Sequence, residues 1–276
     1  MKLSLCNEVL RPLPLAAQCE AAARWGYRAL EIAPFTLADD PTTLSTADAR
    51  QWRHTAHAHG LSVSSLHWLL VKPEGLSLVS DDASLRQRTL DLLRHLIDIA
   101  AACGARVLVH GSPHQRSPGP GQSLADALAR FEDAMATLAP HAASAGVVYC
   151  VEPLGRFETP VINTVAEAAA LVDRIGSPAL RTMLDVSAAS HNETEPVHEV
   201  LRRYLASGHI AHVQLNDRNR RGPGQGDTDQ RPVLQVLKDT AYAGWVAVEP
   251  FDYVPDGPAC AGASARHVHD LWKSLT

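Results

Sequence analysis

The 276-residue sequence predicts a single-domain (β/α)8 barrel that spans residues 1–276. Segments with strand-like and helix-like patterns alternate eight times from one end of the chain to the other. The length is typical of one such barrel, and no linker-like stretch divides the chain. The last four predicted strands each carry an acidic or amide side chain at or near the carboxyl end. In parallel barrels that end holds metal ligands and catalytic groups, so the sequence predicts an active site there.

The first half of the chain supplies four strand–helix units. Short apolar stretches bounded by turn residues predict the strands, and longer amphipathic stretches predict the helices. Gly60 ends the second helix, and a segment at 111–121 that is rich in Gly, Pro and Ser predicts a loop after the fourth strand. The strands are expected at 2–6, 29–33, 61–67 and 107–110, and the helices at 15–25, 46–59, 83–103 and 123–145.

The second half of the chain repeats this order. Asn163 and Thr164 provide an N-cap signal for the helix that follows the fifth strand. The seventh strand is expected at 210–215, and the fifth, sixth and eighth strands end at Glu152, Asp185 and Glu249. Helices are expected at 164–175, near 196–206, at 230–240 and at 261–273. Eight such units make a closed barrel the economical interpretation.

Composition and charge restrict the classes of function. Hydrophobic residues make up 46% of the chain and charged residues 20%, which is enough to form a sizeable core. The net charge of −5 and the lack of a basic run argue against nucleic-acid binding. The five cysteines are scattered, so we expect reduced thiols in a cytoplasmic protein. No segment is long enough to span a membrane, and no membrane partner is expected.

Four strand-end side chains form a candidate metal site. Glu152, Asp185, Gln214 and Glu249 offer only oxygen ligands, which suit Mn²⁺, Mg²⁺ or Co²⁺. Any one acid alone could equally pair with an arginine or cap a helix. His212 lies on the same strand face as Gln214, but Gln214 is about 6.5 Å nearer the carboxyl end. We therefore expect Gln214 to be the fourth ligand, His212 to lie one layer deeper, and about one ion to bind per chain.

Several of these motifs resemble one known family. The resemblance is to the xylose isomerase-like TIM barrels, which include sugar isomerases and epimerases, hydroxypyruvate isomerase and the zinc apurinic-site endonuclease. It spans nearly the whole chain and is specific for the superfamily, but much less so for one reaction. The residues that carry it are Glu152-Pro153, Leu184-Asp185, the segments 213–217 and 222–226, and Val248-Glu249-Pro250.

The resemblance implies a sugar isomerase or epimerase that requires a divalent metal, with Mn²⁺ as the expected ion. In similar enzymes the glutamates at Glu152 and Glu249 are both metal ligands and acid/base groups on opposite faces of the substrate. A cation held by a sugar carbonyl and its neighbouring hydroxyl acidifies the C–H between them and stabilises the metal-bound enediolate that forms. At Gln214, hydroxypyruvate isomerase has Gln and the epimerases have His.

The resemblance also implies residues that bind the sugar. Glu158 follows Glu152 in a pattern similar to the ketose 3-epimerases, and Arg220 matches an arginine that holds substrate oxygens there. His67 and His110 end strands three and four and are expected to bind substrate hydroxyls. His212, although placed beneath the site, is grouped with them as a candidate substrate-binding residue. The alternatives are a solvated pair between Arg156 and Glu158, and histidines that serve only the structure.

One departure keeps other reactions open. Family members often carry His three residues after the strand-six aspartate, where this chain has Ala188, and His191 is a candidate replacement. The same apparatus could therefore serve a lyase or dehydratase that eliminates a β-substituent from a keto-sugar or keto-glycoside. Apurinic-site endonuclease activity is a remote alternative, because the three-zinc ligand pattern is incomplete. The sequence leaves the oligomeric state open, a homo-oligomer included.

Overall fold

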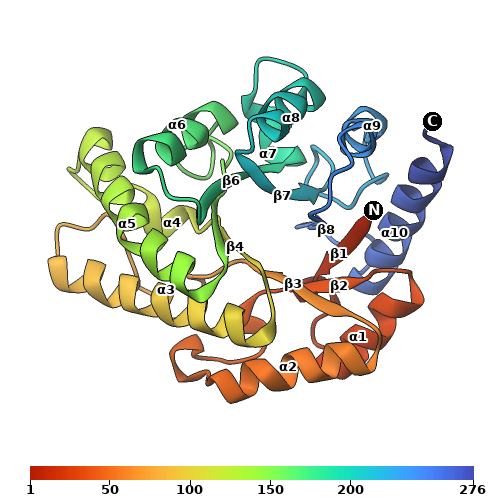
Figure 1. The fold of residues 1–276 in the computed structure, drawn as a ribbon, viewed down its shortest axis with the longest axis horizontal. Coiled ribbons are helices and arrows are strands. Elements are labelled where there is room, and N and C mark those ends of the chain that lie inside the picture. The colour runs from red at the N-terminus through yellow and green to blue at the C-terminus, as the bar shows by residue number, and fades with distance from the viewer.

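Eight parallel strands close into a barrel in the computed structural model, which describes residues 1–276 (Figure 1). Each strand pairs with its neighbour in chain order, and β1 closes the barrel by pairing with β8, with Leu3 beside Val246. The predicted (β/α)8 barrel is therefore confirmed. The strands are β1 (Lys2–Cys6), β2 (Ala29–Ile32), β3 (Ser62–Leu66), β4 (Val107–His110), β5 (Val148–Val151), β6 (Leu180–Asp185), β7 (Ile210–Leu215) and β8 (Trp245–Val248).

Ten α-helices connect the strands and form a ring around the barrel (Figure 1). Ser45 and Asp48 form a capping box at the start of α2, and Gly104 ends α3 in the left-handed conformation with φ of 83°. The helices are α1 (Leu15–Arg24), α2 (Thr46–Ala58), α3 (Ala83–Cys103), α4 (Pro113–Arg116), α5 (Leu124–Ala145), α6 (Val165–Ile175), α7 (Val186–Asn192), α8 (Val197–Ala206), α9 (Arg231–Asp239) and α10 (Gly257–Ser274).

Three features depart from the predicted elements. The segment 111–121, expected as a loop, contains the short helix α4, and a further short helix, α7, directly follows β6. Helix α10 begins four residues earlier than the expected 261–273, because Asp256 caps it and accepts a hydrogen bond from the backbone of Ala259. Short 3₁₀ helices also form at Asn7–Leu10, Pro34–Thr36 and Pro41–Thr43.

The main apolar core lies between the strands and the surrounding helices and contains 67 buried residues. The interior of the barrel is partly polar instead. Ser4 and Ser64 are joined by a hydrogen bond of 2.7 Å between their hydroxyls, and Ser64 contacts Ser65 at 3.0 Å. Ser65 donates to Glu31, which is completely buried on β2. We call these four residues, Ser4, Ser64, Ser65 and Glu31, the polar ladder.

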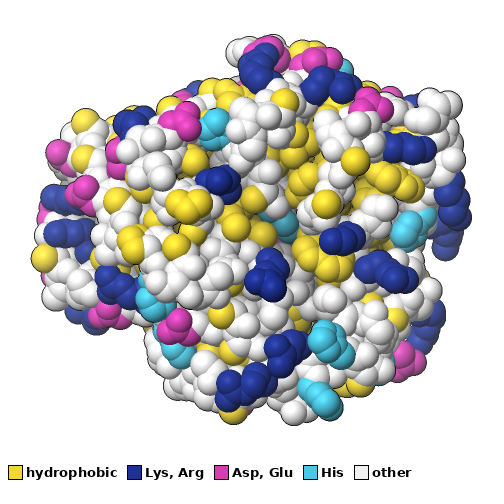
Figure 2. All heavy atoms as spheres, in the orientation of Figure 1, with side chains coloured by type: hydrophobic (Ala, Val, Ile, Leu, Met, Phe, Trp, Pro, Cys, Tyr) yellow, Lys and Arg dark blue, Asp and Glu magenta, His cyan; other side chains and the backbone are white.

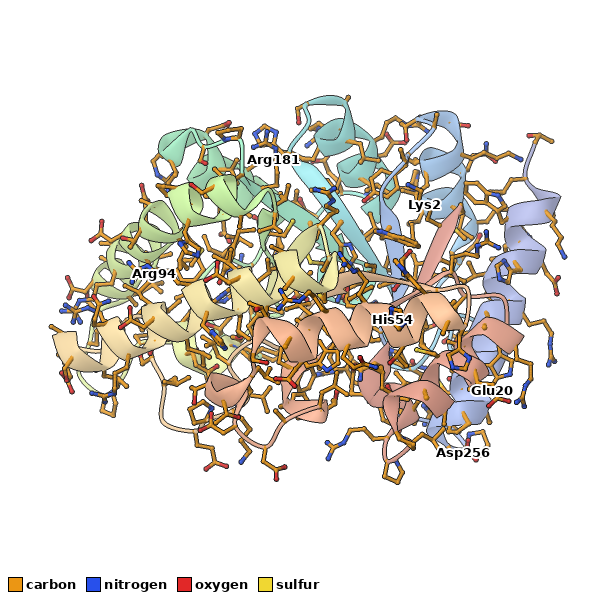
Figure 3. All side chains as sticks on the ribbon, turned by 60° about the horizontal axis from the view of Figure 1, so that its bottom comes forward. Lys2, Glu20, His54, Arg94, Arg181 and Asp256 are labelled. Carbon is orange, nitrogen blue, oxygen red and sulfur yellow. The ribbon has the colours of Figure 1, made fainter.

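The two ends of the barrel lie on opposite sides of the molecule. In Figure 3, Lys2 and Arg181, near the amino-terminal ends of their strands, lie on the side opposite Asp256, which caps the helix after β8. Figure 2 shows Lys and Arg side chains at several separate places on this face, some of them in small groups, rather than joined in one stripe. No helix combines the length and the hydropathy that crossing a bilayer requires.

Candidate active site

Three buried carboxylates meet where β5, β6 and β8 end. Glu152 and Glu249 directly follow β5 and β8, and Asp185 is the last residue of β6. Each offers one carboxylate oxygen, and these oxygens lie within 4.8 Å of one another. All three residues are buried. The barrel thus brings together residues that are up to 97 positions apart, and we call Glu152, Asp185 and Glu249 the carboxylate cluster.

The electrostatics of the carboxylate cluster favour bound protons or a bound cation. Burial raises the pKa of Glu249 to about 8, against the opposing effect of His67. Burial also raises the pKa of Asp185 to about 6. The pKa of Glu152 is raised well above its usual range by burial and by the charges of Glu249 and Asp185. Ionising all three carboxylates at neutral pH therefore costs substantial free energy unless a positive charge lies beside them.

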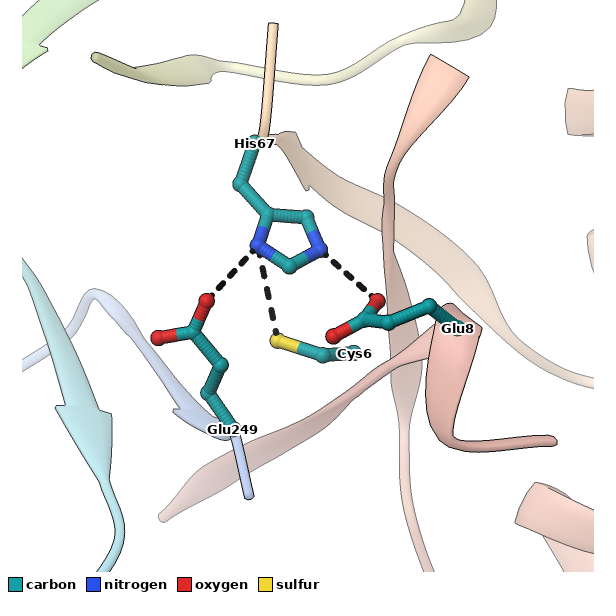
Figure 4. A group of neighbouring side chains, drawn as sticks. All are labelled: Cys6, Glu8, His67 and Glu249. Carbon is teal, nitrogen blue, oxygen red and sulfur yellow. Dashed lines mark hydrogen bonds and ion pairs between the residues drawn. The ribbon is translucent and has the colours of Figure 1, made fainter. Parts of the chain in front are cut away.

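Glu249 is held through one of its two oxygens (Figure 4). Its Oε1 lies 3.0 Å from Nδ1 of His67 and accepts a hydrogen bond of 2.9 Å from Nε1 of Trp68. The other nitrogen of His67 lies 3.0 Å from Oε2 of Glu8. Burial opposes a charge on His67, but Glu8 and Glu249 raise its pKa well above the usual value, so the imidazolium donates to both. Oε2 of Glu249 is buried and has no hydrogen-bond partner.

Asp185 is fixed by the elements on either side of it. Its Oδ1 accepts a hydrogen bond of 2.7 Å from the backbone N–H of Ala188, which makes Asp185 the N-cap of α7. Its Oδ2 accepts from Nδ2 of Asn216 at 2.6 Å, and Asn216 also donates to the backbone carbonyl of Glu249. Ala188 therefore contributes only its backbone N–H to the site. His191, the candidate replacement for the missing histidine, is exposed, and its Nε2 lies 3.0 Å from the backbone carbonyl oxygen of Arg218.

Gln214 and His212 both contact Glu31, at the top of the polar ladder. Nε2 of Gln214 donates to Oε1 of Glu31 at 2.6 Å, while Nε2 of His212 lies 2.6 Å from Oε2. Burial would raise the pKa of Glu31, but His212, His67 and Ser65 hold it below the usual range. Because the amide nitrogen of Gln214 is engaged by Glu31, its carbonyl oxygen is left free, buried and without a partner.

A cavity of about 590 Å³ opens beside the carboxylate cluster. Glu152, Glu249, Glu158 and Arg220 all line it. Glu158 pairs with Arg220 at 3.5 Å, rather than with Arg156, and also accepts a hydrogen bond from the backbone of Gly155. The remaining lining residues are Trp68, Val71, Glu74, Gly75, Gly111, Ser112, Pro113, His114, Gln115, Leu154, Phe157 and Phe251.

The three histidines expected to bind substrate are completely buried and are not among the residues that line this cavity. His67 contacts Glu249, and His212 contacts Glu31. His110 lies 2.7 Å from the hydroxyl of Tyr149, and burial together with Arg116 lowers its pKa to about 3, so its ring is neutral. Their proposed contacts with a substrate stay a prediction.

Three residues that contact the site did not stand out in the sequence. Glu8 contacts His67, and Glu31 contacts Gln214, as described above. Trp68, which contacts Glu249, could be expected to wall the pocket because it lies just past a strand end. Arg116 is completely buried in α4 and donates a hydrogen bond of 2.8 Å to the backbone carbonyl of Glu152. A single acid within an apolar strand, such as Glu31, is the one signal that could have pointed to this group, because a buried charge needs partners.

The fold and the site together define an α/β-barrel enzyme whose acidic groups converge beside a cavity at the carboxyl end of the strands. Residues 19–271 match the family model described as xylose isomerase-like TIM barrel. The chain belongs to this family.

Several proteins similar to this chain are sugar epimerases. D-psicose 3-epimerase from Agrobacterium fabrum is 28% identical over 239 residues, which cover 84% of this chain and 78% of that protein. Fructoselysine 3-epimerase from Shigella flexneri is 24% identical, with coverage of 86% and 85%. A crystal structure of D-psicose 3-epimerase in the presence of D-fructose superposes with a TM-score of 0.83 at 20% identity and covers 99% of both chains. The protein is accordingly an enzyme of the isomerase and epimerase class.

Proposed function

We propose that the protein is a divalent-metal-dependent sugar isomerase or epimerase that moves a proton at a carbon next to a carbonyl. One observation carries the proposal: Glu152 and Glu249 line the same cavity and belong to the same buried carboxylate cluster. Two acids so placed can share the removal and the return of a proton. The relatives, named for a free ketose and for a substituted ketose, support sugars as the class of substrate.

The residues at the site fit a divalent cation. Three carboxylate oxygens converge, and a cation would relieve the repulsion that raises their pKa values. The free carbonyl oxygen of Gln214 fits the role of a fourth ligand. We propose Glu152, Asp185, Gln214 and Glu249 as the ligands, an oxygen-only set that suits Mn²⁺, with Mg²⁺ or Co²⁺ as alternatives. When bound, the cation would polarise the sugar carbonyl and acidify the adjacent C–H.

The two glutamates divide the proton transfer between them in this proposal. One carboxylate takes the proton from the carbon beside the carbonyl, and the other returns a proton to the enediolate. Glu249 suits proton transfer because His67 and Trp68 fix its Oε1 and leave its Oε2 free. A proton returned to the opposite face of the same carbon gives an epimer, and one returned to the neighbouring carbon gives an isomer. Glu158 and Arg220, whose charges balance each other in the cavity, would hydrogen-bond the neutral hydroxyls of the sugar.

A lyase is the second candidate, and Ala188 is the observation that favours it. The position after Asp185 where relatives often place His supplies only a backbone N–H here. The same proton abstraction would then be followed by departure of the β-substituent of a keto-sugar or keto-glycoside. The apurinic-site endonuclease is not favoured, because the net charge is −5 and the groups that could hold a metal contain only one histidine. These groups are the carboxylate cluster and a second set, Cys6, Glu8, His67 and Glu249.

Metal analysis followed by hydrogen exchange tests the proposal. We expect about one divalent ion per chain, and incorporation of deuterium from deuterated water beside the carbonyl of a ketose, together with its epimer or isomer. Release of water or an aglycone after exchange would identify the lyase. Two or three zinc ions per chain would contradict the single-site proposal and favour the endonuclease. A metal-loaded protein that exchanges no proton in any ketose or keto-glycoside would exclude this chemistry altogether.

A further inference from the structure

The cavity beside the carboxylate cluster is larger than a simple sugar requires. Its volume is about 590 Å³, whereas a free ketohexose fills on the order of 200 Å³ at the packing density of a protein interior. Most of its lining comes from loops and short helices beyond the strand ends: 71–75 after β3, 111–115 after β4 and 154–158 after β5. Room for a second ring-sized group therefore lies next to the catalytic acids.

One wall of this cavity is aromatic. The rings of Trp68 and Phe251 lie 6.0 Å apart between their centroids, and the guanidinium of Arg220 lies 4.4 Å from the ring of Phe251 and 5.6 Å from that of Phe157. Phe157 is 62% exposed, which is unusual for so large an apolar side chain. Aromatic faces of this kind stack against flat rings and the C–H faces of sugars.

The backbone around the cavity is held in an uncommon conformation. Five residues other than glycine have positive φ, and three of them, Trp68, Ser112 and Arg220, line this one cavity, with φ of 51°, 44° and 69°. Such conformations persist where the surrounding structure imposes them, commonly at ligand sites. Two of these residues, Trp68 and Arg220, place their side chains beside the same ring, that of Phe251.

The charges that line the cavity favour a neutral substituent over an anionic one. Arg220 is its one arginine or lysine, and it already pairs with Glu158. Glu74 pairs with Lys72 at the rim. A phosphate or carboxylate would therefore find no free lysine or arginine, whereas phosphate sites are built from several positive or N–H donors. The lining matches a neutral group.

We propose that the substrate is a keto-sugar extended by a neutral, ring-sized substituent, either a second sugar or an aryl group, which lies against Phe157, Phe251 and Trp68. This inference rests on the proposed function, since the carbonyl end of the sugar must lie at Glu152 and Glu249. It assigns the loop-lined part of the cavity to substrate selection rather than to the chemical step.

Deuterium exchange with paired substrates tests the inference. The simple sugars are D-fructose, D-psicose and 3-keto-glucose, and fructose 6-phosphate is the anionic comparison. The extended sugars are fructose with glycosyl groups at O4, O5 or O6 and a phenyl 3-keto-glucoside. We expect kcat/KM for at least one extended substrate to exceed that of its unsubstituted parent by tenfold or more. The glycosyl and phenyl arms distinguish the two kinds of ring.

Two variants locate the effect within the cavity. Phe157→Ala should lower the ratio of kcat/KM for extended over simple sugar at least fivefold, because it removes the exposed ring. His114→Trp should lower the same ratio by filling the cavity from α4. Leu124→Ala is the matched control, because Leu124 is an exposed apolar residue that does not line the cavity, and its ratio should equal that of the parent protein.

Three outcomes would overturn the inference. If simple ketoses exchange as fast as every extended substrate, the substituent is not recognised, although the proposed function stands. A preference for fructose 6-phosphate would contradict the neutral group. If no sugar of either kind exchanges in the metal-loaded protein, the proposed function fails and this inference fails with it.

Discussion

The surroundings of Glu249 show how single residues prepare this site. His67 and Trp68 contact its Oε1, while its Oε2 is buried and has no hydrogen-bond partner. Glu152 is held differently, since no side chain donates to its carboxylate and Arg116 binds its backbone carbonyl instead. A side chain at Gly111 would overlap the Glu152 carboxylate, so this glycine makes room for it. One acid is thus oriented by hydrogen bonds and the other by the space left for it.

Replacing either acid by its amide should stop proton transfer while preserving the fold. We expect Glu152→Gln and Glu249→Gln each to lower kcat by roughly 10²–10⁴, the usual contribution of a positioned acid or base. Glu20→Gln, at an exposed position on α1 that does not line the cavity, is the control and should have little effect on kcat. Circular dichroism would check the fold. An amide variant with near-native turnover would show that the two-glutamate mechanism is wrong.

The contacts of Glu31 with Gln214 and His212 lead to a prediction about metal affinity. Gln214→Ala should weaken Mn²⁺ binding clearly in a calorimetric titration, because it removes a proposed ligand. His212→Ala should weaken it less, since His212 contacts Glu31 rather than the carboxylate cluster. Glu31→Gln should also weaken binding, by about 10-fold or more, because it loosens the amide of Gln214. If His212→Ala has the larger effect, His212 is the ligand.

At the scale of elements, helix α4 is one that the sequence did not predict. It has only four residues, within a segment whose Gly, Pro and Ser content is typical of a loop. Arg116 at its end donates to the carbonyl of Glu152 and stacks over Phe131, 5.6 Å from the ring centroid. Helix α4 thereby ties the loop after β4 to the end of β5.

Removing the Arg116 side chain should therefore destabilise the protein. We expect Arg116→Met to lower the free energy of unfolding by about 1–3 kcal/mol, since a buried carbonyl loses its donor. Urea denaturation would measure it. Arg202→Met is the matched control: its pair with Asp239 is largely exposed, so the change should stay within about 0.5 kcal/mol. Equal effects of the two substitutions would contradict this structural role for α4.

At the scale of the whole molecule, the carboxylate cluster makes stability depend on pH. Folding raises the pKa of Glu249 from 4.5 to about 8 and that of Asp185 from 3.8 to about 6. The folded state then binds more protons than the unfolded state, so the stability of the metal-free protein should fall as pH rises from 6 to 8. Bound Mn²⁺ should displace these protons and raise the melting temperature more at pH 8 than at pH 6.

Thermal unfolding at pH 6, 7 and 8, with chelator and with Mn²⁺, measures both effects. Asp185→Asn provides a comparison, since it removes one charge from the cluster and should flatten the pH dependence. A metal-free melting temperature that rises between pH 6 and pH 8 would contradict the prediction. So would a shift by Mn²⁺ that is equal at all three values.

The sequence predicted what depends on local pattern and missed what depends on the closure of the barrel. Strand-end residues such as Asp185 and Glu249 could be recognised, because each follows a short apolar run and all carboxyl ends of parallel strands meet. Glu31 could not be connected to Gln214, because 183 positions separate them and only closure brings β2 and β7 to the same interior. Glu8 was likewise hidden, in a 3₁₀ helix that no periodicity reveals.

The polar ladder also limits how this barrel can change over evolutionary time. An aliphatic barrel interior can exchange one branched residue for another at little cost, because shape is its main requirement. Here Ser4 is linked through Ser64, Ser65 and Glu31 to Gln214, so each hydroxyl satisfies the next. Loss of Ser64 would leave the hydroxyl of Ser4 a buried polar group without a partner, whereas Ser64 itself also donates to the backbone carbonyl of Leu30. We therefore expect covariation between β1 and β3, with Ser64 substituted only together with Ser4. Tolerance to mutation should be greater in the outer ring of helices.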